Sequence, residues 1–244
     1  MNNTENSISR RSVIKILGVG TLGAITLFSG IKCSQTSKNE LESATIVGVT
    51  TRKDNTTSAD ISLLGFGMMR LPIKDEFDKS SINEELASEM VDYAYKNGVN
   101  FFDTAWFYHQ GKSEPFTGKT LSKYNRESYY LSTKMPIGVI DGVDPNGLVT
   151  ATEPLDRAKE IFNLQLKRCN TDYIDFYMLH SLRSLEQFQN VFLGYKVLDF
   201  VAEQKKNGVI KRLGFSFHGA NSEFPLILDA FPWDFVMIQI NYFD

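Results

Sequence analysis

From about residue 62 onward, short apolar runs alternate with longer segments in which apolar residues recur every three or four positions. Few polar residues interrupt the short runs, which is typical of strands buried on both faces of a parallel sheet. The runs predict strands at Leu63–Gly67, Val99–Asp103, Tyr129–Lys134, Tyr173–His180, Val209–Ser216 and Phe235–Gln239. We therefore expect a parallel sheet of six strands with helices between them.

The first of these helices carries recognisable start and stop signals. Ser81-Ile82-Asn83-Glu84 has the form of a capping box, which begins a helix. Leu86, Met90 and Ala94 follow at helical spacing. The pair Asn97-Gly98 then predicts the end of the helix, because glycine is the usual residue just past a helix C-terminus.

Two further segments are predicted to be helical: Ala158, Phe162 and Leu166 mark one, and the other runs from Leu185 to Asn207-Gly208. The mean spacing of the strands, about 34 residues, suits a (β/α)8 barrel, which uses roughly 250 residues for eight units. A doubly wound sheet is the alternative, but Gly65-Phe66-Gly67 lacks the third glycine of a dinucleotide-binding turn. We therefore expect an α/β fold, a TIM barrel of which this chain holds about six of the eight units.

The N-terminal segment has a different pattern. Ser9-Arg10-Arg11-Ser12-Val13-Ile14-Lys15 precedes an uncharged stretch from Ile16 to Ile31, the order of basic and apolar regions in a secretory signal. Paired arginines there resemble the twin-arginine export motif. The stretch is short for a membrane span of roughly 20 residues, which disfavours an ordinary membrane anchor. Residues 1–33 are thus predicted to be a signal for the twin-arginine export machinery, with the periplasm as destination and no stable membrane span after cleavage.

The two cysteines, Cys33 and Cys169, can form neither a disulfide framework nor a four-thiolate metal site. Lipid attachment at Cys33 is disfavoured because Lys32 is not the small residue that this modification requires. Residues 34–60 are rich in Ser, Thr, Asn and Lys, and predict a polar linker with an edge hairpin around Ala44 to Thr51. The remainder, 61–244, is predicted to be the barrel.

Composition and charge narrow the function classes. The 244 residues are 42% hydrophobic and carry a formal net charge of −3, so one large core is expected. That charge gives no positive field to attract nucleic acid or an anionic membrane surface. We therefore do not expect nucleic-acid binding, and we expect no metal site.

Polar side chains end five of the predicted strands in succession: Asp103, Lys134, His180, Ser216 and Gln239. Active sites of barrels lie at the C-terminal ends of the strands, where the loops converge. Each residue alone has a structural explanation, such as a helix cap or a solvated lysine. Five on one rim indicate a functional site.

Tyr108 lies five residues beyond Asp103, so the following loop can return its phenol over this rim. A free phenol titrates near pH 10, and an ammonium close to the oxygen favours the phenolate. Lys134 can supply the ammonium, with Asp103 to orient it, and His180 can hydrogen-bond the same oxygen or a substrate oxygen. The set suits a carbonyl that gains hydride at carbon while its oxygen is protonated, because donors on a developing oxyanion act most strongly in the transition state.

Motifs that contain these residues occur in a fixed order. They are Gly98–Ala105 followed by Tyr108 and Gly111–Glu114, then Ser132–Lys134, Asp172–His180 and Gly208–Ser216. Together they strongly resemble the signature of the aldo-keto reductase family, and the resemblance covers about Ser62 to Asp244.

The resemblance implies a (β/α)8 barrel, NADP(H) as the usual cofactor, and reversible reduction of aldehydes or ketones to alcohols. It implies that Tyr108 is the general acid, tuned by Lys134 and Asp103, and that His180 orients the substrate carbonyl. It also implies a set of cofactor contacts, at the backbone of Gly67 and Met68, at Asp103, and at the amide-binding side chains of Ser216 and Gln239.

Other features differ from the common family pattern. No asparagine follows Ser216, so His218 either replaces that amide contact or is a loop histidine. Phe215–Gly219 and Gln239–Asp244 look like a branch that often carries a C-terminal iron-sulfur extension, whose cysteines do not occur in this sequence. In the family, units seven and eight supply most contacts to the cofactor's phosphates. These units are absent from this chain, so we expect a truncated barrel that binds NADPH weakly or not at all by itself. A non-catalytic redox-sensing or partner-binding barrel, or an inactive fragment, are the alternatives.

Overall fold

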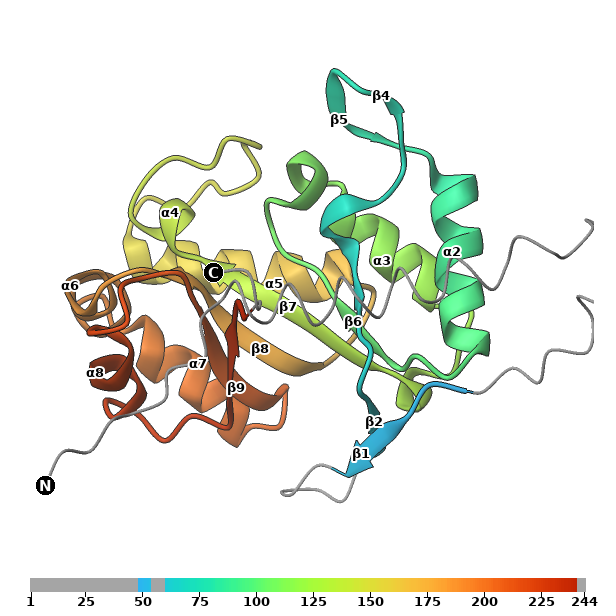
Figure 1. Cartoon of the computed structure of the whole chain (residues 1–244). Coiled ribbons are helices and arrows are strands. Elements are labelled where there is room, and N and C mark those ends of the chain that lie inside the picture. The colour runs from blue at the N-terminus through green and yellow to red at the C-terminus, as the bar shows by residue number, and fades with distance from the viewer. Residues whose placement is uncertain (1–47, 54–59, 241–244) are drawn as a thin grey trace, which may run out of the picture. The chain divides into compact units, whose positions relative to one another are not determined.

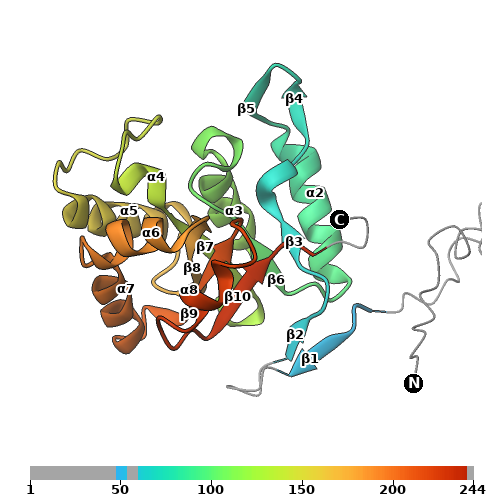
Figure 2. The same cartoon turned by 60° about the vertical axis from the view of Figure 1, so that its left-hand side comes forward.

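Six parallel strands form one curved sheet in this computed structural model, which describes residues 48–53 and 60–240. Its strands are β3 (Phe66–Gly67), β6 (Phe101–Asp103), β7 (Tyr130–Pro136), β8 (Ile174–Leu182), β9 (Ile210–Phe217) and β10 (Phe235–Ile238). Each strand pairs with the next one along the chain, so β3 and β10 form the two edges (Figures 1 and 2). This order is that of an incomplete (β/α)8 barrel, and all six predicted strands are present. The predicted signal segment and Cys33 lie outside the described residues.

Helical segments connect the strands and pack along one face of the sheet (Figure 2). They are η2 (Met68–Arg70), α2 (Glu84–Lys96), η3 (Tyr108–Gly111), α3 (Ser113–Leu121), η4 (Arg126–Ser128), α4 (Ile137–Ile140), α5 (Pro154–Arg168), α6 (Leu185–Gln187), the π-helical η5 (Phe188–Leu193), α7 (Val197–Lys206) and α8 (Phe224–Leu228). Among the described residues, no helix has the length and apolar character needed to cross a membrane.

The predicted helix ends are confirmed, but the predicted start of α2 is wrong. Helices α2 and α7 stop just before Asn97-Gly98 and Asn207-Gly208, with both glycines at positive φ. Ser81, in contrast, lies in strand β5 (Asp78–Ile82), where its hydroxyl donates to the carbonyl oxygen of Asp78 at 2.6 Å. Asn83 is the N-cap of α2 instead, since asparagine caps a helix as well as serine does.

The buried face of α2 also differs from the predicted one. Leu86 and Met90 are 45% and 41% exposed, whereas Ala87 and Val91 are fully buried. The helical period is as predicted, but the face turned toward the sheet lies one residue later. Packing against the neighbouring elements, which the local pattern does not contain, sets this rotation.

Two antiparallel hairpins lie at opposite ends of the sheet (Figure 1). The first pairs β1 (Thr51–Lys53) with β2 (Asp60–Ser62) and precedes β3. Of the segment predicted as a hairpin, Ala44 to Thr51, only Thr51 belongs to β1 among the described residues, and residues 44–47 lie outside the described part. The second pairs β4 (Ile73–Asp75) with β5 directly after β3, so it stands at the C-terminal ends of the strands.

The packing of α3 against the end of α5 depends on one glycine. A Cβ atom on Gly118 would lie 2.5 Å from the carbonyl oxygen of Arg168 and 2.6 Å from the carbonyl carbon of Cys169. Such distances are far below van der Waals contact, and both partners are backbone atoms that cannot rotate away. The two helices therefore approach as closely as they do only because position 118 has no side chain.

We expect Gly118→Ala to lower the free energy of unfolding by about 2 kcal/mol, because α3 and α5 must separate to admit the methyl group. Gly138→Ala in α4 is the matched control, since its Cβ would meet nothing within 4 Å. That variant should be unchanged or more stable by up to about 1 kcal/mol. Urea unfolding followed by circular dichroism measures both, and equal stabilities would contradict the close approach.

Candidate active site

Lys134 and Asp103 form a buried ion pair at the C-terminal end of the sheet. Lys134 is 1% exposed, and its ammonium nitrogen Nζ donates to Asp103 Oδ2 at 2.7 Å. The same nitrogen donates to the carbonyl oxygen of Thr104 at 2.8 Å and to Tyr108 Oη at 3.1 Å. Since an ammonium has three hydrogens, these three acceptors satisfy it completely and hold it in one position.

The register of two strands brings the pair together. Asp103, the last residue of β6, pairs with Ser132 of β7, and Ser132 Oγ donates to Asp103 Oδ1 at 2.9 Å. Lys134 lies two residues further along β7, so its side chain emerges on the same side of the sheet as that of Ser132. Strand β7 continues to Pro136, so Lys134 lies inside the strand and not at its end as predicted.

The loop after β6 carries Tyr108 over this pair. Its next residues, His109 and Gln110, have φ values of 50° and 51°, a left-handed conformation that turns the chain sharply. The imidazole of His109 holds the turn, since Nε2 accepts from the backbone N–H of Leu71 at 3.0 Å. Its Nδ1 lies 2.7 Å from the carbonyl oxygen of Lys79 and donates to it, because Nε2 is the acceptor. His109 therefore links the Tyr108 loop to the β4–β5 hairpin.

His180 lies in β8 with its ring against that of Tyr108. The two rings meet edge to face, with centroids 6.1 Å apart. Burial lowers the pKa of His180 to about 3, and the charges of Lys134 and His218 add to this effect. The imidazole is therefore neutral at ordinary pH, and its N–H makes no hydrogen bond to another described residue.

A cavity of about 760 Å³ opens beside these two rings. Tyr108 and His180 line it together with Phe107, whereas Trp106 is fully buried and its Nε1 donates to Asp144 Oδ1 at 3.2 Å. A small molecule in the cavity would therefore meet a phenol and a neutral imidazole side by side.

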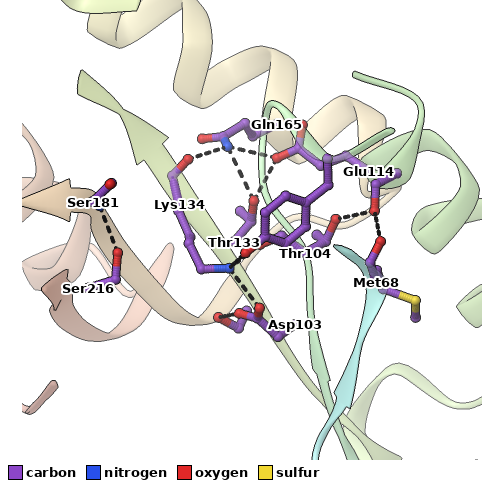
Figure 3. A network of polar contacts seen from close by, with 12 residues as sticks. Met68, Asp103, Thr104, Glu114, Thr133, Lys134, Gln165, Ser181 and Ser216 are labelled. Carbon is purple, nitrogen blue, oxygen red and sulfur yellow. Dashed lines mark hydrogen bonds and ion pairs between the residues drawn. The ribbon is translucent and has the colours of Figure 1, made fainter. Parts of the chain in front are cut away.

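A second polar layer lies behind Lys134 (Figure 3). The side-chain amide of Gln165 donates to the carbonyl oxygen of Lys134 at 2.9 Å and to Glu114 Oε1 at 2.7 Å. Thr133 Oγ1 donates to the same Glu114 oxygen at 2.6 Å, and Tyr177 donates to Gln165 Oε1 at 2.6 Å. Lys134 is thus fixed through its backbone as well as through its ammonium.

Glu114 is fully buried, and burial raises the pKa of its carboxyl group although Arg168 opposes the shift. Arg168 Nε lies 3.1 Å from Glu114 Oε2, but the two are not aligned for a hydrogen bond, so the contact is an ion pair without one. In the sequence, Glu114 was only part of the motif Gly111–Glu114 and had no predicted role. No sequence motif pointed to Gln165, which lies in α5.

The residues assigned to a cofactor lie on the same rim but are not all free. Ser216 Oγ accepts from the backbone N–H of Ser181 at 2.7 Å, and Gln239 lines a neighbouring cavity of about 510 Å³ with His218. Gly67 pairs with Asp103 in the sheet, and a Cβ there would meet nothing within 4 Å. Met68 is fully buried, and its carbonyl oxygen accepts from Ser113 Oγ at 3.1 Å.

The site can therefore bind a carbonyl oxygen between two neutral donors, one of which has a cation behind it. Among the described residues, no group of three or more His, Cys, Asp or Glu side chains could hold a metal ion. The chemistry that this geometry favours is proton transfer to an oxygen atom.

Comparisons with known proteins agree with this geometry. The pattern of the aldo/keto reductase family matches residues 63–243. An uncharacterized oxidoreductase, YqkF of Bacillus subtilis, is 29% identical over 170 residues, which cover 68% of this chain and 48% of that protein. Probable aldo-keto reductase 1 of Glycine max is 28% identical over 167 residues, covering 67% of this chain and 44% of that protein. The chain thus spans about half the length of the curated relatives it matches.

Solved structures show the same fold. Aldo-keto reductase AKR11C1 from Bacillus halodurans, in its holo form, is 27% identical with a TM-score of 0.58, covering 79% of this chain and 58% of that one. A structure of aldo-keto reductase AKR2E5 complexed with NADPH has a TM-score of 0.56 at 21% identity, covering 80% of this chain and 56% of that one. By the match over residues 63–243, the chain belongs to the aldo/keto reductase family.

Proposed function

We propose that this chain carries the proton-transfer site of an NADP(H)-dependent oxidoreductase that reduces aldehydes or ketones to alcohols. The observation that carries the proposal is the Lys134 ammonium, bonded to both Asp103 Oδ2 and Tyr108 Oη, beside a neutral His180. Family membership favours a nicotinamide cofactor, and a related structure contains NADPH.

In the proposed mechanism, the substrate carbonyl oxygen lies between Tyr108 Oη and the imidazole N–H of His180. A nicotinamide cofactor, when bound, would supply the hydride that the carbonyl carbon gains. Tyr108 gives its proton to the oxygen, and the adjacent ammonium of Lys134 stabilises the phenolate that remains. Asp103 keeps the ammonium aimed at Oη during this charge change.

The rim offers groups that would hold the nicotinamide end of the cofactor. The hydroxyl of Ser216 is 2% exposed and accepts one hydrogen bond, while its own hydrogen has no acceptor among the described residues. A carboxamide oxygen would satisfy it. The open space beside Gly67, next to Asp103, leaves room for the adjoining ribose. Gln239 follows β10 on the same rim and would also hydrogen-bond the carboxamide.

Tyr108→Phe is expected to lower kcat for NADPH-dependent reduction of an aldehyde by about 10² to 10⁴, because the general acid is removed. Tyr93→Phe in α2 is the control, since Tyr93 is 70% exposed and lies away from the cavity. Loss of NADPH absorbance measures both. Equal rates for Tyr108→Phe and the wild type would exclude the acid role, and NADPH binding without turnover would favour a redox-sensing barrel.

Folding stability should depend on pH through His180. Its pKa is about 3 in the folded protein against an ordinary value of 6.5, so the unfolded chain binds an extra proton below pH 6.5. The stability from neutral His180 is therefore complete above pH 6.5 and is lost as the pH falls toward 3. We expect a loss of at most about 2 kcal/mol between pH 7 and pH 5.

The variant His180→Gln should lose less stability than the wild type over the same pH interval, because glutamine does not titrate. Urea midpoints at pH 7 and pH 5 give the comparison, in which all other titrating groups are common to both proteins. The same pH dependence in both would show that His180 is not held neutral by the fold.

We also propose that residues 1–33 direct export by the twin-arginine route, on the strength of Arg10-Arg11 ahead of the uncharged Ile16–Ile31. Replacing both arginines by lysine should abolish the periplasmic pool, measured by fractionation and immunoblotting, although the charge is kept. Lys38→Arg in the linker is the control. Unchanged periplasmic protein in the double variant would refute the assignment.

A further inference from the structure

The cavity beside Tyr108 and His180 is lined by cations and by no carboxylate. Its charged lining side chains are Arg70, Lys79 and Arg183, and no aspartate or glutamate of the described residues lines it. Three histidines, His109, His180 and His218, also line the cavity. A ligand that enters the cavity therefore meets a positive field close to the carbonyl-binding position.

The three cations are available to a ligand. None of their side chains forms a hydrogen bond or an ion pair with another described residue, and all three residues are exposed. The cations at the cavity thus keep their hydrogen-bond donors free.

The backbone at two of these cations, Arg70 and Arg183, is held in place by buried or hydrogen-bonded neighbours. Arg70 lies between the fully buried Met68 and Leu71, whose backbone N–H donates to His109. Arg183 follows the buried Leu182 at the end of β8, and its own backbone N–H donates to Gln187 Oε1 at 3.1 Å. Because both backbones are fixed, a ligand would order only the side chains and not the loops.

Apolar side chains form another part of the cavity lining, beside the polar Gln110 and Ser181. Met69, Leu71, Ile73 and Phe107 line it, of which Met69 is 53% and Phe107 38% exposed. Exposed apolar surface beside free guanidinium groups suits a molecule with an apolar body and an anionic end. Arginine matches a carboxylate particularly well, because its planar donors can bind both oxygens at once.

We propose that this cavity selects carbonyl substrates that carry a carboxylate, which Arg70 and Arg183 bind while Tyr108 and His180 hold the carbonyl. Lys79, on strand β5, adds positive charge from the hairpin side. The position of the carbonyl in this inference rests on the proposed function. The anion site is inferred from Arg70 and Arg183 alone. A phosphate of the cofactor is the other possible source of the anion, and the test separates the two.

The test compares 4-carboxybenzaldehyde with its neutral methyl ester, methyl 4-formylbenzoate, which keeps the ring and the aldehyde. We expect kcat/KM to favour the acid by about tenfold at low salt, and this preference to shrink at 1 M salt. Arg70→Gln and Arg183→Gln should each lower it about threefold, and the double variant should abolish it, with the ester rate unchanged. Lys206→Gln in the last turn of α7, toward the opposite end of the sheet, is the charge-matched control.

Direct binding distinguishes failure of this inference from failure of the proposed function. Isothermal titration of the acid and the ester into the Tyr108→Phe protein should show tighter binding of the acid, lost in the triple variant with both arginine substitutions. Tighter binding of the acid, together with no aldehyde reduction by the wild type, would refute the proposed reductase function but support the anion site. Equal binding of acid and ester would overturn the inference, as would arginine variants that weaken only NADPH binding, since the anion would then be a cofactor phosphate.

Discussion

Lys134 carries a charge that has almost no contact with water, and the site depends on how that charge is satisfied. Removing one partner of a buried ion pair costs about 3 to 5 kcal/mol, because the other charge stays buried and unpaired. Here Asp103, the carbonyl oxygen of Thr104 and Tyr108 Oη accept all three ammonium hydrogens. Tyr108 therefore helps to satisfy the buried ammonium, and in the proposed mechanism the same contact stabilises the phenolate.

The buried ammonium of Lys134 keeps its three acceptors only if the lysine is held in position by its surroundings. Gln165 and Thr133 both donate to Glu114. Gln165 also donates to the backbone carbonyl oxygen of Lys134. Gln165 comes from α5 and Glu114 from α3, the two helices that approach without a side chain at Gly118. Gly118 thus influences the position of Lys134 through the packing of these two helices.

Strands hold the ion pair of Lys134 and Asp103, whereas residues beyond the strand ends line much of the cavity. Tyr108, Arg70 and Arg183 all lie just beyond strand ends, on turns fixed by buried neighbours and by the imidazole of His109. A parallel sheet brings the C-terminal ends of its strands to one rim, and residues from distant parts of the sequence meet there. The neutral state of His180 has the same origin, since its burial comes from that convergence.

The sequence alone was sufficient for the strands, for the helix ends at Gly98 and Gly208, and for the rim residues Asp103, Lys134 and His180. These depend on local patterns: apolar runs, glycine at positive φ, and polar residues that follow a run. The tertiary structure alone decided which face of α2 is buried, that Asn83 and not Ser81 begins it, and that Gln165 supports Lys134. It also decided that Arg70 and Arg183 share one cavity. The start of α2 follows from the neighbouring β4–β5 hairpin, which holds Ser81 in a strand. The others follow from contacts between residues that are far apart in the chain, and the energies of such contacts do not appear in any local window of the sequence.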